Sequence, residues 1–364
     1  MPAQLRVLFV PFGTARVAAT RYRVFQYIPY LKEHNFQCRV FSIISEATTA
    51  RMIASPSLSG AAKLLYYVRV VVEKLIRFSA VLLLARHYQV VFLQRTTLPF
   101  ALEKALWLVN SNIIFDIDDA IFMPDHQEEG LIGRIKARTK AMEVSGMLKL
   151  SKFVIVENEY IRSYCAKYCR NILLIPGPID TERNFPRLRR ASERVVIGWI
   201  GGPSTSVYLH MLDGVLPVLA RKFNILVKLV GAGAYRFPGV ETVNLEWSYD
   251  DEVKELQSFD IGVMPMPDNE WTRGKLGCKM LQYMAVGVPA VVSYTPTNAE
   301  VVRNGENGFL AKTEQEWLQA ISCLINDEGL RRRIGGQGRK TAEEAFSLRV
   351  NAPRLTEALM QVCR

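Results

Sequence analysis

The sequence lacks both the disulfide framework of a small secreted protein and the ligand spacing of a zinc site. Its six cysteines have no regular spacing, and the short pair Cys165 and Cys169 has no histidine nearby to complete a metal site. No N-terminal signal peptide is recognisable either. We therefore expect reduced thiols, no metal and no other cofactor, in a cytoplasmic protein.

The most apolar segment, residues 61–86, lacks the uncharged run that a membrane-spanning helix needs. Arg69, Glu73, Lys74 and Arg77 interrupt it, so it contains no uncharged window of about 18 residues. Its apolar residues fall near helical spacing with the charges on the other side. Two interpretations stay open: a helix that covers a sheet, or a helix that lies on a membrane surface.

Signatures of nucleic-acid binding are missing although the net charge is +11. Residues 1–190 hold 27 Lys and Arg against 15 Asp and Glu, whereas residues 191–364 hold 19 against 20. No helix-turn-helix, zinc finger or aromatic RNA-binding signature accompanies the basic half, so we expect no nucleic acid as a partner. An anionic membrane surface or a phosphorylated acceptor remains a candidate partner, and the basic residues 131–149 form a second candidate interfacial segment.

The N-terminal residues predict the start of an open α/β sheet that lacks a dinucleotide-binding loop. Residues 5–13 form a continuous apolar run that predicts a buried parallel strand, but no G-x-G-x-x-G motif follows it. A helix is expected over residues 20–31. Arg21 and Arg23 lie at its start, at the carboxyl edge of the strand, where open α/β sheets bind ligands.

Length and composition indicate two α/β domains. The chain has 364 residues, of which 49% are hydrophobic and 22% are charged, which is enough apolar material for two cores. Residues 183–193 have the polar, proline-containing composition of a linker. We therefore predict a first domain over residues 1–190, a second over residues 191–345, and a C-terminal helix within residues 346–364.

An aspartate cluster ends one strand of the first domain. Asp116, Asp118 and Asp119 could hold a divalent cation on composition alone. They could equally position arginines or acceptor hydroxyls, or cap a loop.

The second domain begins with a strand that runs into Gly201, Gly202 and Pro203. We expect Ser204 and Thr205 to cap a helix that begins at about residue 206. Glycines permit close backbone approach and a helix N-terminus attracts anions, so a diphosphate could bind at this loop.

Residues 271–289, WTRGKLGCKMLQYMAVGVP, form the most informative stretch. They predict a turn, a helix over about residues 277–284 and a stop at Gly287. Lys275 and Lys279 lie near the first turn of that helix, beside N–H groups that have no partner within the helix. The pattern predicts a second part of an anion site.

This stretch resembles the C-terminal signature of family 4 (group 1) glycosyltransferases of the GT-B fold. The commoner signature reads Glu-Gly-Phe-Gly followed by a helix that ends Glu-Ala-Met-Ala-x-Gly-x-Pro. Gly274 and Gln282 replace the two glutamates of its Glu-x7-Glu motif, so the chain resembles a variant branch. Residues 176–180 and 298–309 also match segments of the family, and the resemblance covers most of residues 195–345.

The resemblance implies α/β architecture of the GT-B type, with two doubly wound, Rossmann-like domains that face each other across a cleft. It implies that the C-terminal helix crosses back to the first domain and that the transfer retains the anomeric configuration without a metal. The family's loop Arg and Lys align with Gly202 and Val207, which transfers the charge requirement to Arg273, Lys275 and Lys279. The candidate catalytic residues are Glu270, Lys275 and Lys279, the donor-binding residues are Gly201, Gly202, Ser204, Arg273, Gln282 and Glu300, and the acceptor-side residues are Arg23, Asp118 and Asp119.

The expected function is a retaining, hexosyltransferase-type transfer of a sugar from a nucleoside-diphosphate donor. The acceptor would be a glycan or a lipid-linked molecule in cell-surface polysaccharide or glycoconjugate synthesis, reached by a cytoplasmic enzyme that is peripheral on the inner face of the membrane. Two alternatives stay open. One is a nucleotide-sugar epimerase on the same fold, and the other is a catalytically silent relative that acts as a binding subunit.

Overall fold

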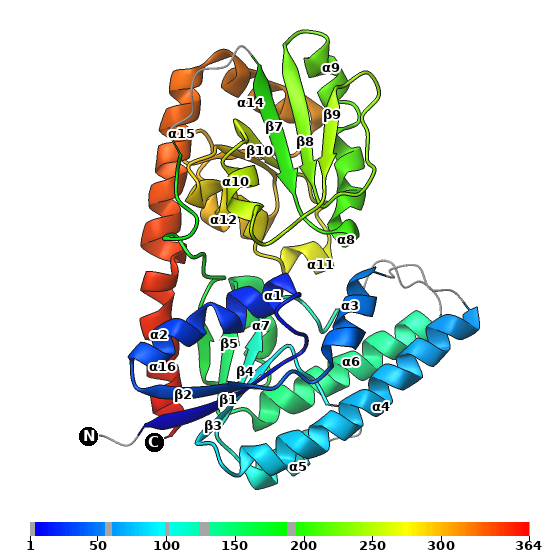
Figure 1. Ribbon diagram of the computed structural model, residues 1–364, viewed down its shortest axis with the longest axis vertical. Helices are drawn as coiled ribbons and strands as arrows, with labels where there is room; N and C mark the ends of the chain where they lie inside the picture. Colours follow the sequence, from blue (N-terminus) through cyan, green and yellow to red (C-terminus); the bar gives the residue numbers. More distant parts are fainter. Residues whose placement is uncertain (1–3, 55–59, 99–101, 124–130, 188–193, 364) are drawn as a thin grey trace. The chain divides into compact units, whose positions relative to one another are not determined.

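The computed structural model describes residues 4–54, 60–98, 102–123, 131–187 and 194–363. The chain forms two compact units (Figure 1). The first comprises Met1–Pro178 and Asn351–Arg364, and the second comprises Ile179–Val350. The predicted boundary near residue 190 lies outside the described residues.

The first unit is built on a parallel sheet with the strand order β2-β1-β3-β4-β5-β6. The run of Val, Leu, Ile and Phe in these strands is typical of a sheet that is buried on both faces. Because β1 pairs with both β2 and β3, the loop that follows β1 lies where the strand order reverses. The strands are β1 (Leu5–Pro11), β2 (Phe36–Val40), β3 (Val90–Gln94), β4 (Ile113–Ile117), β5 (Phe153–Val156) and β6 (Ile172–Leu174).

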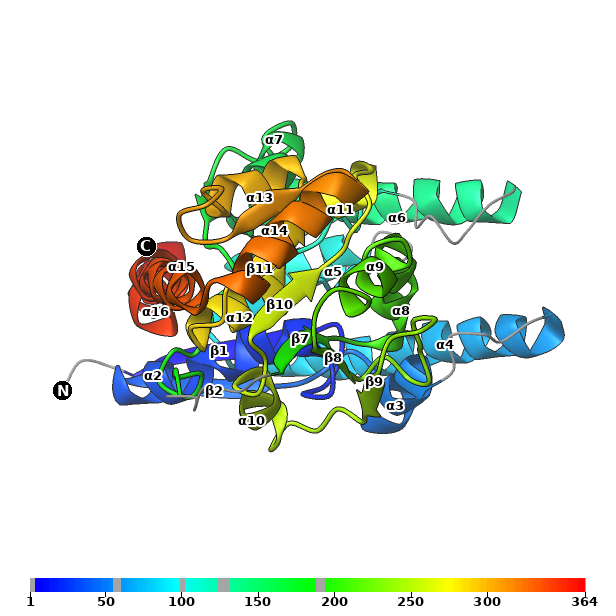
Figure 2. The same ribbon diagram turned by 90° about the horizontal axis from the view of Figure 1, so that it is seen from above.

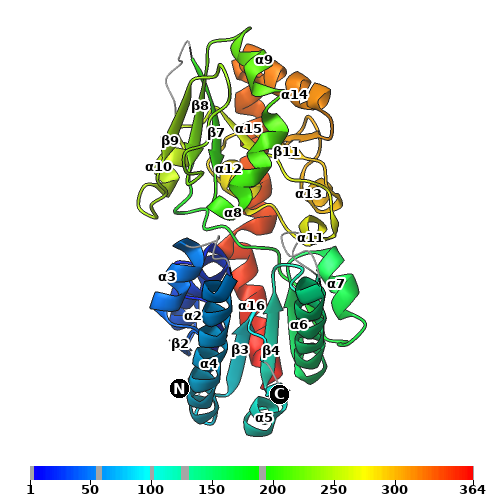
Figure 3. The same ribbon diagram turned by 90° about the vertical axis from the view of Figure 1, so that its right-hand side faces the viewer.

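Helices cover both faces of this sheet, with α4 and α6 on one side and α16 on the other (Figure 3). The helix expected at residues 20–31 is interrupted by a π-helical turn, and the final helix begins at Leu348 and contains Pro353. The helical elements are α1 (Ala18–Thr20), η1 (Arg21–Phe25), α2 (Tyr27–Glu33), α3 (Glu46–Ala54), α4 (Gly60–Ala85), α5 (Glu103–Val109), α6 (Leu131–Leu150), α7 (Glu159–Cys165) and α16 (Leu348–Val362).

The second unit repeats the architecture with the strand order β12-β11-β10-β7-β8-β9, again with parallel pairs. Here β7 pairs with both β10 and β8, so the loop after β7 lies at the reversal of strand order. The predicted α/β class with two doubly wound sheets is confirmed. The strands are β7 (Val195–Ile200), β8 (Ile225–Val230), β9 (Thr242–Leu245), β10 (Ile261–Met264), β11 (Ala290–Ser293) and β12 (Phe309–Ala311).

Short helices and two longer ones enclose the second sheet, whose strands are seen from above in Figure 2. Its core contains Trp199, Tyr283 and Phe259, all nearly inaccessible to solvent. The helical elements are α8 (Pro203–Ser206), η2 (Val207–Leu212), α9 (Leu216–Ala220), α10 (Glu252–Leu256), α11 (Glu270–Arg273), α12 (Cys278–Ala285), α13 (Pro296–Val301), α14 (Glu314–Asn326), α15 (Glu328–Thr341) and η3 (Ala342–Phe346).

All six cysteines have free thiols. Among the helices in the described part of the chain, none is both long and apolar enough to cross a membrane.

Candidate functional site

Helix α12 is fixed against the second sheet by one buried tyrosine. The hydroxyl of Tyr283 accepts a hydrogen bond from the backbone N–H of Ile200 at 3.2 Å and donates one to the carbonyl of Val263 at 3.1 Å. Its ring fills the space above Gly262, where a Cβ atom would lie 2.5 Å from the ring. Tyr283 therefore ties α12 to the ends of β7 and β10.

The loop after β7 differs in detail from the sequence-based prediction. Helix α8 begins at Pro203 with Gly202 as its N-cap, not at about residue 206, and neither Ser204 nor Thr205 caps it. Because proline at the first position needs no hydrogen-bond acceptor, the helix can begin directly after Gly202. The hydroxyl of Thr205 donates to the carbonyl of Gly202 at 3.1 Å, and Ser204 is exposed.

Lys279, from the first turn of α12, crosses this loop. Its Nζ donates a hydrogen bond to Thr205 Oγ1 at 3.1 Å and lies 5.3 Å from the centre of the Trp199 ring. A Cβ atom at Gly201 would lie 2.4 Å from Lys279 Cε and 2.7 Å from the Trp199 ring, so only glycine fits beneath the lysine. The structure thus brings together the glycine loop and the lysine-bearing helix that the sequence predicted separately.

The surroundings of Lys279 destabilise its charged form. Burial lowers the pKa of Lys279 to about 8, and the positive charge of Lys275 contributes to the decrease. Lys275 Nζ lies 5.2 Å from the centre of the Trp271 ring. Neither lysine forms an ion pair with a carboxylate of the described residues. A bound anion would relieve the repulsion between the two ammonium groups.

The other residues predicted for the donor site are less well positioned to bind an anion. Arg273 binds Asp268 through two hydrogen bonds of 2.7 and 3.2 Å, so its charge is already compensated. Glu270 is exposed at the start of α11, and Glu300 is exposed on α13. Gln282 is nearly buried on α12.

Asn298, which the sequence reasoning did not assign to the site, faces the start of α12. Its amide nitrogen donates to the carbonyl of Ser293 at 2.8 Å, while its amide oxygen is buried and has no hydrogen-bond partner within the described structure. A Cβ atom at Gly277 would lie 3.2 Å from that oxygen and 2.4 Å from Met264 Cε. Gly277 is therefore required for close packing at the first turn of α12.

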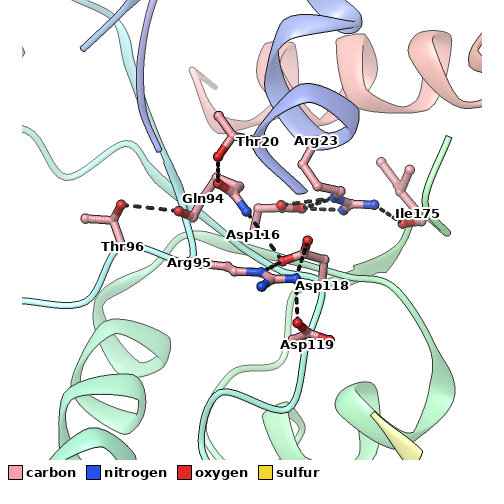
Figure 4. A network of polar contacts seen from close by, with 9 residues as sticks. All are labelled: Thr20, Arg23, Gln94, Arg95, Thr96, Asp116, Asp118, Asp119 and Ile175. Carbon is pink, nitrogen blue, oxygen red and sulfur yellow. Dashed lines mark hydrogen bonds and ion pairs between the residues drawn. The ribbon is translucent and has the colours of Figure 1, made fainter. Parts of the chain in front are cut away.

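The polar residues of the first unit form a buried network, shown in Figure 4. Arg23 Nε donates to both carboxylate oxygens of Asp116 at 3.2 and 3.1 Å, and Arg23 Nη1 donates to the carbonyl of Ile175 at 2.7 Å. Both side chains of this ion pair are almost inaccessible. We predicted that Arg23 faces an acceptor; in this structure its guanidinium binds Asp116 and the carbonyl of Ile175 inside the first unit.

A second arginine, missed from the sequence, engages the other two aspartates. Arg95 follows β3 with a φ of 52°, an uncommon value for a residue other than glycine. Its Nη2 contacts Asp118 Oδ2 at 2.8 Å and Asp119 Oδ2 at 2.7 Å. Burial alone would raise the pKa of Asp118, but Arg95 holds it below its ordinary value. Of the open interpretations, the contacts favour the positioning of an arginine.

Glu157 is a further carboxyl group at this edge that the sequence reasoning missed. It follows β5 directly, is partly exposed, and lies so close to Gly177 that a Cβ atom there would be 2.5 Å from Glu157 Oε1. Burial raises the pKa of Glu157 well above its ordinary range, and the negative charge of Asp118 adds to the increase.

A metal site is not evident in the ranges that the structure describes. No group of three or more His, Cys, Asp or Glu side chains there is arranged to hold a metal ion. Asp116, Asp118 and Asp119 are instead occupied by arginines.

Comparison with known proteins matches the second unit to a family. Residues 194–327 match the family model of glycosyl transferases group 1. A capsular polysaccharide biosynthesis glycosyltransferase of Staphylococcus aureus, CapM, is 25% identical over 175 residues, which cover 44% of this chain and 44% of that protein. The chain matches less than half the length of the curated relatives with which it aligns.

Solved structures match both units. Sucrose-phosphate synthase from Thermosynechococcus elongatus gives a TM-score of 0.71 at 13% identity, covering 98% of this chain and 99% of that one. HepE from Anabaena, solved in complex with UDP and glucose, gives a TM-score of 0.66 at 15% identity, covering 98% of this chain and 100% of that one. These likenesses establish the GT-B type of fold.

Proposed function

Because residues 194–327 match the family model of glycosyl transferases group 1, we propose that the protein transfers a sugar from a nucleoside-diphosphate donor to an acceptor. The observation that carries the proposal is the position of Lys279 against Gly201 and Thr205, at the reversal of strand order in the second sheet. Open α/β sheets bind ligands at this position.

The leaving group explains why such a site needs cations. In the transfer, the bond between the anomeric carbon and the diphosphate oxygen breaks, and the electron pair stays on the diphosphate. The developing negative charge would be stabilised by Lys279, by Lys275 and by the N-terminus of α12. The backbone of Gly201 and Gly202 can approach the phosphates closely, because no side chain covers it.

The remaining donor contacts follow the family resemblance. Gln282 or Glu300 would bind the ribose hydroxyls, Glu270 would contact the sugar, and Ser204 would donate its hydroxyl to a phosphate. We give Arg273 a secondary role, since Asp268 already compensates its charge. The resemblance also supports a transfer that retains the anomeric configuration, without a metal.

For the acceptor we propose a glycan or a lipid-linked molecule used in cell-surface polysaccharide or glycoconjugate synthesis. The similarity to CapM of Staphylococcus aureus, a glycosyltransferase of capsular polysaccharide biosynthesis, supports this class. In the first unit, Asp119 and the partly exposed Glu157 are the groups that we assign to acceptor hydroxyls. A cytoplasmic enzyme that is peripheral on the inner face of the membrane would reach such an acceptor.

A thermal-shift series with nucleoside diphosphates and their sugars tests the proposal. A ligand that binds only the folded protein raises Tm by linkage, whatever the acceptor is. HepE is described in complex with UDP and glucose, so UDP and UDP-glucose come first, followed by the guanosine, adenosine, cytidine and thymidine compounds. We expect one base to raise Tm and the same nucleotide to fail in Lys279→Met. A series without any shift would contradict the donor site.

A further inference from the structure

Helix α4 has two apolar faces, and only one of them packs against the protein. Phe78, Val81 and Ala85 are buried in the core of the first unit. The opposite side carries a row of exposed apolar residues, which we call the α4 stripe: Leu65 is 72% exposed, Val68 50%, Val72 48%, Ile76 66% and Leu83 60%.

The α4 stripe is continuous. At about 100° per residue, its five side chains fall within about 80° of the helix circumference, and they extend over about 27 Å along the axis. The interpretation of residues 61–86 as a helix that simply covers the sheet is therefore incomplete. The residues that give the segment much of its apolar character face outward, where a surface helix normally carries polar side chains.

The exposed charged residues that border the stripe are both positive. Arg69 and Arg86 are exposed along its borders, and neither forms an ion pair with a described carboxylate. Glu73 is the sole acidic residue between Gly60 and Ala85. Its carboxylate accepts a hydrogen bond from the backbone N–H of Ser45 at 2.6 Å and another from the Thr48 hydroxyl, so it is held on the protein side.

A neighbouring helix, α5, also exposes large apolar side chains. Asn110, at the end of α5, donates hydrogen bonds to the carbonyls of Ala85 and Tyr88 at 3.0 and 2.8 Å, which ties α5 to the C-terminal end of α4. Helix α5 exposes Trp107 (43%) and Leu108 (78%). Helix α6 lies on the same side of the first sheet as α4 (Figures 2 and 3).

We propose that the α4 stripe is the surface by which the protein lies on an anionic lipid bilayer. The apolar side chains would enter the boundary between headgroups and acyl chains, with α4 parallel to the membrane plane. Arg69 and Arg86 would reach the lipid phosphates from the borders, because their long stems allow the charged ends to stay in water. The inference deepens the proposed membrane association and does not depend on sugar transfer.

Charge distinguishes this occupant from a second copy of the chain. A two-fold contact between two α4 stripes would bring four arginines together, while the one carboxylate of each α4, Glu73, is already bound to Ser45 and Thr48. An anionic lipid surface supplies the missing negative charge without any further protein.

Sedimentation of the full chain with vesicles tests the proposal. We expect binding to vesicles of phosphatidylcholine mixed with phosphatidylglycerol, and weak binding to phosphatidylcholine alone. The double variant Val72→Asn/Ile76→Asn should bind the anionic vesicles at least about tenfold more weakly, since two side chains no longer leave water. Arg69→Gln/Arg86→Gln should lose the preference for anionic vesicles.

Met360→Asn is the matched control, because Met360 is 44% exposed on α16, on the other side of the same sheet. It should bind vesicles as the wild type does. An unchanged Tm without any ligand shows that each variant is folded, so the vesicle test does not rely on the donor site. Equal vesicle binding by the wild type and Val72→Asn/Ile76→Asn would overturn the proposal. So would a wild-type dimer that only this variant dissociates, because the stripe would then be a protein interface.

Discussion

Lys279 is the residue whose chemistry decides how the donor site responds to pH. Its pKa of about 8 in the folded protein means that about half of the molecules carry an uncharged amine at pH 8. A bound diphosphate favours the charged form and raises that pKa. Binding should therefore take up protons near pH 8 and weaken as pH rises above it.

Calorimetry in buffers of different ionisation enthalpy measures this uptake. For the nucleoside diphosphate that raises Tm, we expect about half a proton taken up at pH 8 and almost none at pH 6. In Lys279→Met the uptake near pH 8 should disappear, and the affinity should fall by about 1.5–3 kcal/mol, the contribution of a hydrogen bond to a charged group. Uptake that persists in Lys279→Met would assign the titration to another group.

Arg23 and Asp116 form a buried ion pair that we expect to stabilise the first unit. Because both side chains are buried, Arg23→Met would leave an uncompensated carboxylate in the core of the first unit. We expect a loss of about 3–5 kcal/mol in the free energy of unfolding, measured with urea. The double variant Arg23→Met/Asp116→Leu should recover much of it.

Arg16→Met is the control for that experiment. Arg16 pairs with Glu46 at the surface, where both side chains are more than half exposed, so its removal should change the free energy of unfolding by less than about 1 kcal/mol. If Arg23→Met were equally mild, Arg23 would be available for the role at the acceptor that we first predicted.

At the residue scale, the sequence did not predict which charged residues contact each other, and Arg95 and Glu157 were missed for this reason. Arg23 and Asp116 are 93 positions apart in the chain, and no local pattern links them. The sequence showed the aspartates as a cluster but not their arginine partners. Arg23 comes from a helical segment and Arg95 from the end of another strand. Which acidic groups are already compensated depends on strand order and register.

At the scale of elements, the contact between the β7 loop and α12 makes a steric prediction. In Gly201→Ala the new methyl group would lie 2.4 Å from Lys279 Cε and 2.7 Å from the buried Trp199 ring. The lysine or the ring must shift, and we expect a loss of about 1–3 kcal/mol in unfolding free energy together with weaker nucleotide binding.

Gly202→Ala is the matched substitution one residue later. A Cβ atom at Gly202 has no neighbour within 4 Å, and its φ of −102° suits any residue. Urea unfolding should therefore show a loss of less than about 1 kcal/mol, because glycine is a better N-cap than alanine but no steric clash is added. Equal destabilisation by the two substitutions would show that Lys279 does not pack on Gly201 as described.

Helices and strands were predicted best where the spacing of apolar residues agreed with the residues that end an element. The strand before Gly201 and the helix that ends near Gly287 appear close to their predicted bounds, because apolar runs and glycine stops act locally. The orientation of α4 was not predictable in the same way. Both of its sides are apolar, so the hydrophobic pattern alone does not say which side faces the sheet.

At the scale of the whole molecule, two units with separate cores follow from length and from the repeated strand-helix pattern. The family match lies in the second unit, and this unit contains the lysines, glycines and helix N-terminus of the proposed donor site. The first unit contributes carboxyl groups and the α4 stripe. Donor chemistry and acceptor chemistry would thus be carried by different units.

Chromatography of a reaction mixture tests the central claim most directly. The protein would be incubated with the sugar nucleotide that raises Tm and with washed membranes, from cells that lack its gene, as the source of acceptor. We predict release of the nucleoside diphosphate, at least about tenfold slower with Lys279→Met. An isomeric sugar nucleotide without diphosphate release would identify an epimerase instead. An unchanged sugar nucleotide would identify a silent relative, and either result would contradict sugar transfer.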